Sequence, residues 1–240
     1  MGGAESGPPS RAAAITAEAR RGRLAARPGP APATVTPGIR PLGLGDRRDG
    51  LLLIPDAAGA TGMPLLVWLH GAGGDAPGTL RMLEARARAA GVALLVPESR
   101  GRTWDIILGA YGPDVAFLDA ALAAAFAALP ADPARIGVGG FSDGASYALS
   151  LGLANGDLFR AVLAFSPGFA APPGAEGRPA IYVSHGIADE VLPIGPCSRR
   201  LVLRLRRAGY AVRYDEFEGG HVIPDAAAEA GLATLLAGAA

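Results

Sequence analysis

The sequence predicts an α/β protein: one domain built on a mostly parallel, doubly wound sheet that is flanked by helices. From residue 49 onward, short runs rich in Val, Leu and Ile alternate with longer Ala-rich segments of helical period. Several of the short runs are apolar at every position, which is typical of parallel strands covered on both faces. This alternation favours strands joined by helical crossovers. The 240 residues, 50% hydrophobic and 18% charged, suit one large folded domain and exclude a disordered chain.

The elements follow in order along the chain. The expected strands are the apolar runs Leu51–Ile54, Leu65–Leu69, Val92–Val96, Ile136–Gly139, Ala161–Phe165, Ala180–Val183 and Val212–Phe217. The expected helices between and after them are Thr79–Ala90, Pro113–Leu129, Asp143–Ala154, Cys197–Ala208 and Asp225–Leu236. Stop signals follow three of these helices, at Pro130, Asn155-Gly156 and Gly209. Because the connections are short, no large cap domain is expected.

The first 48 residues lack this pattern. Residues 1–20 have few large apolar side chains, so we expect a flexible N-terminal tail. Residues 21–48 are expected to form an extended lead-in to a core at 49–240, and 21–240 then make a single domain. The run Ala12–Ala17 is too short and too weakly apolar for a signal peptide, and no run of about 18 large apolar residues predicts a membrane span. The expected location is cytoplasmic.

Charge and cysteine content exclude several classes of function. The 22 basic and 22 acidic residues balance, so no nucleic-acid partner is expected. The single cysteine, Cys197, excludes an internal disulfide framework and a multi-cysteine zinc or iron–sulfur site. The only histidines are His70, His185 and His221, so any chemistry that requires an imidazole depends on one of these three.

A G-x-S-x-G pattern at Gly140–Gly144 places Ser142 between an expected strand and an expected helix. A serine on such a sharp turn projects its hydroxyl from the sheet edge, and close approach of strand and helix tolerates only small residues on either side. The following helix aims free N–H groups and partial positive charge at the same place. The pattern favours Ser142 as a nucleophile; an ordinary tight turn in a Gly-rich sequence is the alternative.

A serine needs a base, and His221 follows the last expected strand in the loop Gly219-Gly220-His221. Ligand sites gather at the carboxyl ends of strands in open α/β sheets. Asp189 lies on the loop after the preceding strand, where it could orient the histidine and stabilise its charged form. Glu190 is the rival acid, and a solvated loop histidine is the alternative for His221. We expect His70 and His185 to bond the backbone of their own loops.

A Gly-rich loop, Leu69-His70-Gly71-Ala72-Gly73-Gly74-Asp75, directly follows the strand expected at Leu65–Leu69. Such a loop can present a backbone N–H to an oxyanion, and by position the donors would be Ala72 N–H and Asp143 N–H. The loop matches neither the dinucleotide nor the Walker A phosphate-binding pattern, and the chain contains no lysine for the latter. A purely structural turn is the alternative.

Together these segments resemble the α/β-hydrolase superfamily. More narrowly, they resemble the phospholipase/carboxylesterase group, which includes acyl-protein thioesterases, and the poly(3-hydroxybutyrate) depolymerase-like esterases. The matching segments are L-H-G-A-G-G-D at 69–75, G-F-S-D-G at 140–144, H-G-I-A-D-E-V-L-P at 185–193 and G-G-H-V-I-P at 219–224. The resemblance covers residues 65–240 and implies an α/β-hydrolase fold. It also implies Ser142 as nucleophile, Asp189 rather than Glu190 as acid, His221 as base, and Ala72 with Asp143 at the oxyanion hole.

The resemblance further implies a serine hydrolase that cleaves carboxylic esters through an acyl-enzyme, without metal or cofactor. Thioesterase or polyester depolymerase activity is the alternative within enzymes, and a non-catalytic binding protein of the same fold is the alternative of another class. Trp104 and Phe169 lie after strands at the same sheet edge and are expected as pocket residues, with simple packing as the alternative for Trp104. The expected partner is a small-molecule ester, and the expected state is a monomer or homodimer.

Overall fold

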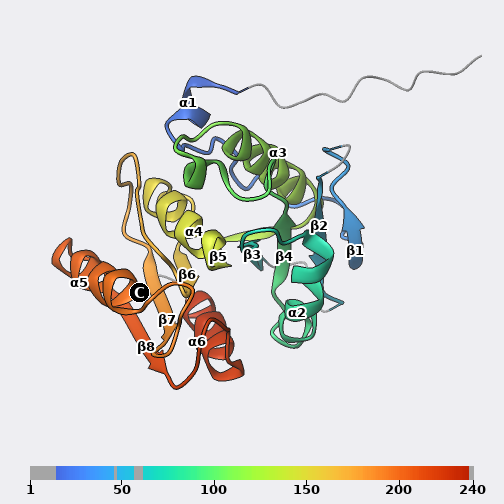
Figure 1. Cartoon of the computed structure of the whole chain (residues 1–240). Coiled ribbons are helices and arrows are strands. Elements are labelled where there is room, and N and C mark those ends of the chain that lie inside the picture. Colours follow the sequence, from blue (N-terminus) through green and yellow to red (C-terminus); the bar gives the residue numbers. More distant parts are fainter. Residues whose placement is uncertain (1–14, 46–47, 57–61, 238–240) are drawn as a thin grey trace, which may run out of the picture.

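A computed structural model describes residues 15–45, 48–56 and 62–237 of the chain. In these residues, eight strands form one sheet in the order β1-β2-β4-β3-β5-β6-β7-β8 (Figure 1). The strands are β1 (Gly38–Pro41), β2 (Gly50–Ile54), β3 (Met63–Leu69), β4 (Ala93–Pro97), β5 (Ala131–Phe141), β6 (Ala161–Phe165), β7 (Ala180–Gly186) and β8 (Val212–Phe217). From β4 through to β8 all pairings are parallel, whereas β2 runs antiparallel to both β1 and β4.

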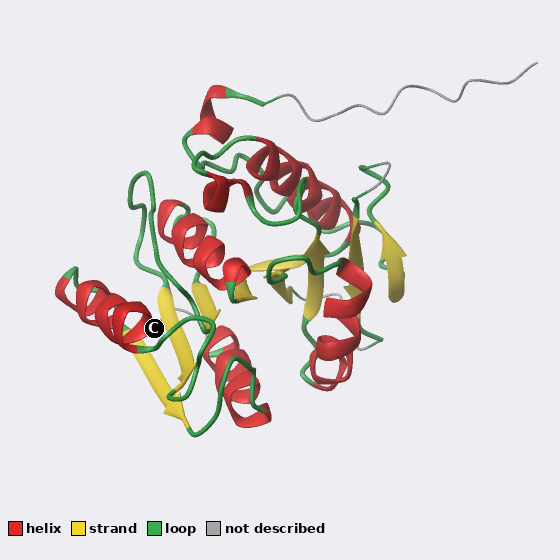
Figure 2. Cartoon of the chain, in the orientation of Figure 1, coloured by secondary structure: helices red, strands yellow, loops and turns green. Residues whose placement is uncertain are grey.

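Helices cover both faces of this sheet (Figure 2). They are α1 (Ala17–Arg20), α2 (Ala76–Ala89), α3 (Pro113–Ala128), α4 (Asp143–Ala154), α5 (Arg200–Arg207) and α6 (Asp225–Leu236). One core cluster joins alternate strand residues to α3, α4 and α5, and a second joins the opposite side of the strands to α2 and α6. Because strand side chains alternate between faces, neighbours such as Leu65 and Leu66 belong to different clusters.

The predicted doubly wound α/β architecture is confirmed. Strands β6 and β8 and helices α4 and α6 have the predicted ends, and the other predicted elements differ by a few residues. Strand β1 and helix α1 were not predicted. The helix predicted at Cys197–Ala208 begins as a short π-helix, Gly195–Arg199, before α5. Within the described chain no large cap domain covers the sheet, and none of its helices is long and apolar enough to cross a bilayer.

The N-terminal segment packs against the domain more closely than the predicted tail and lead-in. Residues 1–14 of that tail lie outside the described residues, but Ala19 in α1 and Leu24 are buried. The Leu24 N–H donates to Asn155 Oδ1 at 2.9 Å, and Asn155 Nδ2 donates to the Gly22 carbonyl at 2.8 Å. Arg23 forms two 3.0 Å hydrogen bonds to the Asp157 carboxylate. The segment is therefore fixed to the C-terminal end of α4.

The register of the parallel strands brings the predicted site loops to one edge. Leu69 at the end of β3 pairs with Gly140 in β5, and Phe141 pairs with Phe165 at the end of β6. Further along, β7 and β8 end together at Gly186 and Phe217. The loops that follow β3, β5, β7 and β8 therefore emerge side by side at the carboxyl edge of the sheet.

Candidate active site

Ser142 lies on a strained turn between β5 and α4. Its φ of 58° and ψ of −120° are outside the regions that L-residues favour, at a cost of about 1–3 kcal/mol. The Ser142 N–H donates to the Phe165 carbonyl at 2.9 Å, which holds the turn against β6. A Cβ at Gly140 would lie 2.5 Å from the Gly144 carbonyl, and one at Gly144 would overlap the Leu69 carbonyl oxygen. The two glycines are thus required by close approach, as the G-x-S-x-G pattern predicts.

Asp189 and His221 meet across the loops that follow β7 and β8. His221 Nδ1 lies 2.6 Å from Asp189 Oδ2. The other carboxylate oxygen, Oδ1, accepts the N–H groups of Val191 and Leu192 at 2.9 and 2.8 Å. Burial by itself would raise the pKa of Asp189, but the hydrogen bonds from His221 and Leu192 outweigh it and hold the pKa below its usual value. Asp189 is therefore ionised at neutral pH, whereas Glu190 is exposed.

His221 and Ser142 line the same cavity, which has a volume of about 560 Å³. Within the described residues their side chains are not hydrogen-bonded to each other, as is common in unliganded sites. Because Nδ1 of His221 faces Asp189, Nε2 is the ring nitrogen left to receive a proton. The imidazole packs against Phe141, with 4.6 Å between ring centres, and its side chain is 15% exposed.

The Gly-rich loop after β3 forms a tight turn beside Ser142. The Gly74 N–H donates to the Gly71 carbonyl at 3.0 Å, and the Gly73 N–H donates to the Arg102 carbonyl at 2.8 Å. Among the described residues, the N–H of Ala72 has no backbone acceptor, and Ala72 lines the cavity. Asp143 is the first residue of α4, so its N–H has no acceptor within the helix. Neither predicted donor therefore has a backbone acceptor among the described residues, and Ala72 lines the same cavity as Ser142.

His70 fixes this loop through both ring nitrogens. Nδ1 lies 2.7 Å from the Gly71 carbonyl oxygen, and Nε2 accepts the Ser99 N–H at 3.1 Å, so the proton is on Nδ1. Burial is the main cause of a lowered His70 pKa, which keeps the ring neutral. The predicted backbone bonding of His70 is confirmed, and it makes His70 a support of the turn.

Searches with the sequence gave no matching family model and no match among curated proteins. Solved structures do match. Esterase PE8 has a TM-score of 0.64 and 27% identity, covering 78% of this chain and 97% of its own. The fluorophosphonate-binding serine hydrolase FphF of Staphylococcus aureus has a TM-score of 0.64 and 13% identity, covering 78% and 92%. A phospholipase/carboxylesterase from Dyadobacter fermentans has a TM-score of 0.54 and 23% identity, covering 73% and 90%.

The chain belongs to the α/β-hydrolase superfamily. The sheet order, the connections and the carboxyl-edge position of the loops are those of this fold, so the resemblance inferred from the motifs is confirmed at this level.

The two predicted pocket residues of this α/β-hydrolase do not line the cavity at Ser142. Trp104 is fully buried, donates its indole N–H to the His70 carbonyl at 2.8 Å, and stacks on Tyr147 with 5.1 Å between ring centres. It packs against His70 of the Gly-rich turn and does not line the cavity. Phe169 is half-buried, and its N–H approaches Ser146 Oγ at 3.4 Å on the α4 side. Neither residue lines the cavity at Ser142.

The walls of the cavity come from residues that sequence reasoning did not single out. They include Trp68, Thr79, Arg81, Met82, Phe141 and Val191. Most of these lie beside a motif: Phe141 is the first of the two variable residues of G-x-S-x-G, Trp68 precedes the Gly-rich loop, and Thr79 to Met82 lie in the first turns of α2. That closeness in sequence is the signal that could have found them.

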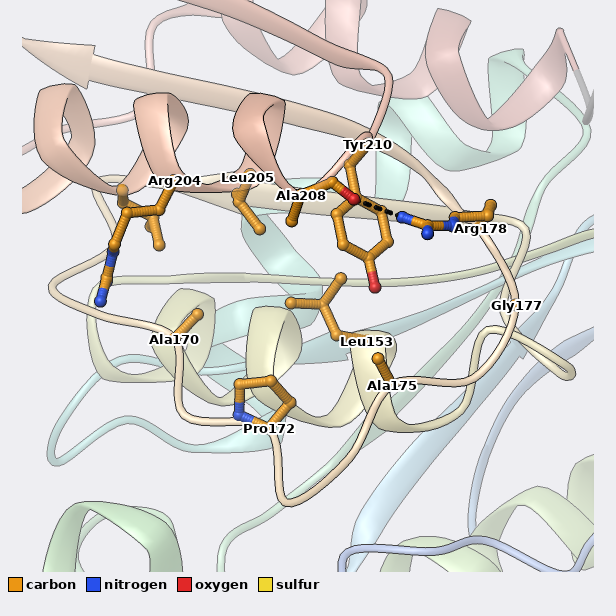
Figure 3. Close-up of a pocket in the computed structure, with 11 residues that line it drawn as sticks. Leu153, Ala170, Pro172, Ala175, Gly177, Arg178, Arg204, Leu205, Ala208 and Tyr210 are labelled. Atoms are coloured by element: carbon orange, nitrogen blue, oxygen red, sulfur yellow. Dashed lines mark hydrogen bonds between the residues drawn. The ribbon is translucent and has the colours of Figure 1, made fainter.

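A second, larger cavity of this hydrolase, about 740 Å³, lies between α4, α5 and the loop after β6 (Figure 3). Its lining is mainly apolar, from Leu153, Leu205 and Pro172, with Arg178 at one end. Arg178 donates to the Ala208 carbonyl at 2.6 Å. No member of the Ser142, Asp189 and His221 group lines it. The larger of these two cavities is therefore not the one that holds the predicted catalytic residues. Within the described chain no cluster of His, Cys, Asp and Glu could hold a metal ion.

Two carboxylates, of buried Asp114 and half-buried Asp105, brace the segment that carries Trp104. Asp114 accepts the N–H groups of Arg100 and Asp105 at 2.5 and 2.6 Å, and Asp105 accepts those of Gly112 and Asp114 at 2.9 and 3.0 Å. Burial is the main reason that the pKa of Asp114 rises to about 6; the Arg100 N–H opposes this shift and the neighbouring charge of Asp105 adds to it.

This shift predicts a pH-dependent stability. Because the folded protein binds the Asp114 proton more tightly than the unfolded chain, whose carboxyl titrates near 3.8, the contribution of Asp114 to stability falls as pH rises from about 4 to about 6. We expect the free energy of unfolding of wild type minus that of Asp114→Asn to fall by up to about 3 kcal/mol over this range. Urea unfolding at several pH values measures it; a constant difference would contradict the shift.

Proposed function

We propose that this chain hydrolyses carboxylic esters of small molecules through an acyl-enzyme formed on Ser142. The observation that carries the proposal is the hydrogen bond between half-buried His221 and buried Asp189 near a strained serine turn, with Ser142 and His221 on one cavity. The similar structures support it, since they include an esterase, a phospholipase/carboxylesterase and a serine hydrolase.

In the first step, Ser142 Oγ attacks the ester carbonyl carbon while His221 Nε2 takes the hydroxyl proton. The ionised Asp189 holds the His221 Nδ1–H and stabilises the imidazolium. The N–H groups of Ala72 and Asp143 stabilise the negative carbonyl oxygen, each worth roughly 3 kcal/mol. The carbon–oxygen bond to the alcohol then breaks as His221 returns the proton to the leaving oxygen.

In the second step, a water molecule replaces the alcohol. His221 Nε2 takes a proton from the water as its oxygen attacks the acyl carbon, and returns that proton to Ser142 Oγ when the acid leaves. A protonated His221 cannot act as the base, so kcat/KM is expected to fall in acid with a single-proton slope. A flat pH profile, with chemistry rate-limiting, would contradict the role of His221. Stopped-assay rates on one ester across the pH range measure this.

The assignment is tested with a fluorophosphonate probe and with p-nitrophenyl esters of short and medium acyl chains. Ser142→Ala is expected to abolish labelling and turnover. Ser166→Ala is the matched control, because Ser166 also has a positive φ, of 49°, and also follows a strand of the same sheet, yet its hydroxyl is buried. It is expected to keep both activities. Labelling that persists in Ser142→Ala would refute the nucleophile.

Two other outcomes separate the alternatives. Turnover of acyl thioesters in preference to oxygen esters would assign the site to a thioesterase, and release of monomers from a polyester film would assign it to a depolymerase. Labelling of wild type without turnover of any of these substrates would favour a binding protein that retains a reactive serine.

The cavity wall predicts a dependence on acyl length. Met82 lines the cavity from α2 and is 45% exposed, so a larger side chain there narrows the cavity without disturbing the core. We expect Met82→Trp to lower kcat/KM for p-nitrophenyl octanoate about 10-fold more than for the acetate. Leu203→Trp is the control, since Leu203 is exposed on α5 and does not line the cavity. An equal loss on both esters in Met82→Trp would contradict this wall as a length determinant.

A further inference from the structure

The mechanism above leaves one buried imidazole unused. His185 lies near the end of β7, and its side chain is 0% exposed. Nδ1 lies 2.6 Å from Ser198 Oγ, at the start of the segment that leads into α5. Nε2 lies 2.7 Å from the Leu192 carbonyl oxygen and 3.1 Å from Asp189 Oδ2. The predicted backbone bond of His185 is confirmed, but its contacts with Ser198 and Asp189 were not foreseen.

These partners assign the proton on the His185 ring. The Leu192 carbonyl can only accept, so Nε2 carries the hydrogen and donates to it, and the Asp189 carboxylate lies 3.1 Å from the same nitrogen. Nδ1 is then an acceptor and receives the Ser198 hydroxyl hydrogen. Burial is the main cause of a lowered His185 pKa, with the Leu192 carbonyl and the Asp189 charge opposing it, so the ring is neutral. Ser198, itself fully buried, therefore favours the tautomer whose Nε2–H bonds the Leu192 carbonyl beside Asp189.

Polar N–H groups lie on both sides of the Asp189 carboxylate. Oδ1 accepts the N–H groups of Val191 and Leu192, Oδ2 accepts from His221 Nδ1 at 2.6 Å, and His185 Nε2 lies 3.1 Å from the same Oδ2. The two imidazoles share one oxygen. The partial positive charge of the His185 N–H therefore lies beside the carboxylate oxygen that faces His221.

We propose that His185, oriented by Ser198, is a positioning residue that holds Asp189 Oδ2 in line with His221 and tempers its effect on the basicity of His221. This inference rests on the proposed function, in which His221 is the base. His185 does not line the cavity, so it acts through Asp189 and not on the substrate. Its loss is therefore expected to lower kcat and to leave KM unchanged.

Other charged or titratable groups face this network. Glu216 in β8 pairs in register with His185 and is neutralised by Arg199, whose Nη2 lies 2.6 Å from the carboxylate. The Cys197 thiol lies close enough to Asp189 for the carboxylate charge to add to burial in raising its pKa. Neither group is altered by the variants below, so a change in pH profile can be assigned to His185.

His185→Phe removes the donor and keeps a planar ring, whereas His185→Gln keeps an N–H donor near the position of Nε2. We expect His185→Phe to lower kcat by about 10- to 100-fold with KM unchanged. Its acid limb is expected at higher pH, because Asp189 then acts on His221 alone. His185→Gln is expected to restore most of kcat and the wild-type profile. The kcat of Ser198→Ala is expected to lie between those of His185→Phe and His185→Gln. Ser198→Thr keeps the hydroxyl and is expected to have the wild-type kcat.

Two readouts make the test decisive. Thermal melts show whether each variant is folded, and the downfield proton resonance of His221 Nδ1–H reports its bond to Asp189 without any substrate. The proposal is overturned if His185→Phe keeps the wild-type kcat and profile, or if Phe and Gln variants lose kcat equally. If His185→Phe does not fold, Ser198→Ala and Ser198→Thr are used instead: the proposal is overturned if Ser198→Ala keeps the wild-type kcat and pH profile, or if both variants lose kcat equally. Failure of the proposed function can be told apart from failure of this inference. In the first case wild type turns over no ester, but the His221 Nδ1–H resonance can still be compared between wild type and the His185 variants.

Discussion

Asp189→Asn is expected to lower kcat/KM on p-nitrophenyl esters by about 10⁴-fold while leaving the protein folded. The reason lies in how the carboxylate is bound. Oδ1 accepts two backbone N–H groups, from Val191 and Leu192, so an asparagine will place its carbonyl oxygen there. Its NH₂ group then faces His221 and donates to Nδ1. The His221 proton is forced onto Nε2, which can no longer accept the proton of Ser142.

The neighbouring acid provides the matched control. Glu190 is exposed, whereas Asp189 is buried against His221. Glu190→Gln is expected to stay within about twofold of wild type, because an exposed charge without a close partner contributes little. Steady-state kinetics on one ester, with a thermal melt for each variant, measure both. A large loss in Glu190→Gln together with an active Asp189→Asn would reverse the choice of acid.

Gly144→Ala is expected to destabilise the folded protein by about 3 kcal/mol or more and to reduce turnover by at least about 100-fold. The added methyl group would overlap the carbonyl oxygens of Leu69 and His70, which are backbone atoms and cannot rotate away. The start of α4 must therefore move away from β3. Ser142 and the Asp143 N–H move with it, so nucleophile and oxyanion donor both lose their positions.

Gly174→Ala serves as the control for this change, because no atom lies within 4 Å of a Cβ at that loop position. It is expected to melt and turn over like wild type. A destabilisation of this size lowers Tm by about 6–12 °C in a protein of this length. A Gly144→Ala protein with unchanged Tm would show that α4 and β3 are not in the close contact described.

Much of the fold was predictable because its central strands are continuous apolar runs with covered faces. Ala161–Phe165, buried at every position, has the predicted bounds for that reason. Val212–Phe217 also has the predicted bounds, although it carries three charged residues and its side chains are half-buried or exposed. Strand β1, Gly38–Pro41, was missed because it is a short edge strand whose residues are only half-buried or exposed and which ends in proline. Helix α2 begins at Ala76, before the predicted Thr79, because Asp75 caps it with a side-chain bond to the Gly78 N–H.

The candidate site also has a part that the sequence predicts and a part that depends on tertiary packing. Ser142, the Gly-rich turn and the acid and base loops are local patterns, each placed at a strand end by the topology, so the sequence alone predicts their meeting. The position of Met82 in the cavity wall depends on how α2 packs beside the cavity, and no local sequence pattern predicts that packing. The His185–Ser198 contact joins a strand end to a later helix, so no local pattern predicts it. The Trp104 side chain is buried rather than in the cavity, because its indole N–H donates to the His70 carbonyl.

The attachment of residues 22–24 to the far end of α4 has a practical consequence for engineering. The helix that begins at the nucleophile turn is tied at its other end by Asn155, which bonds the N-terminal segment in both directions. A purification tag joined ahead of residue 15 leaves the two hydrogen bonds of Asn155 intact. Trimming the chain to residue 25 would strip away the partners of Asn155 and uncover the site of Leu24, so shortened versions made for crystallisation should keep residues 16–24.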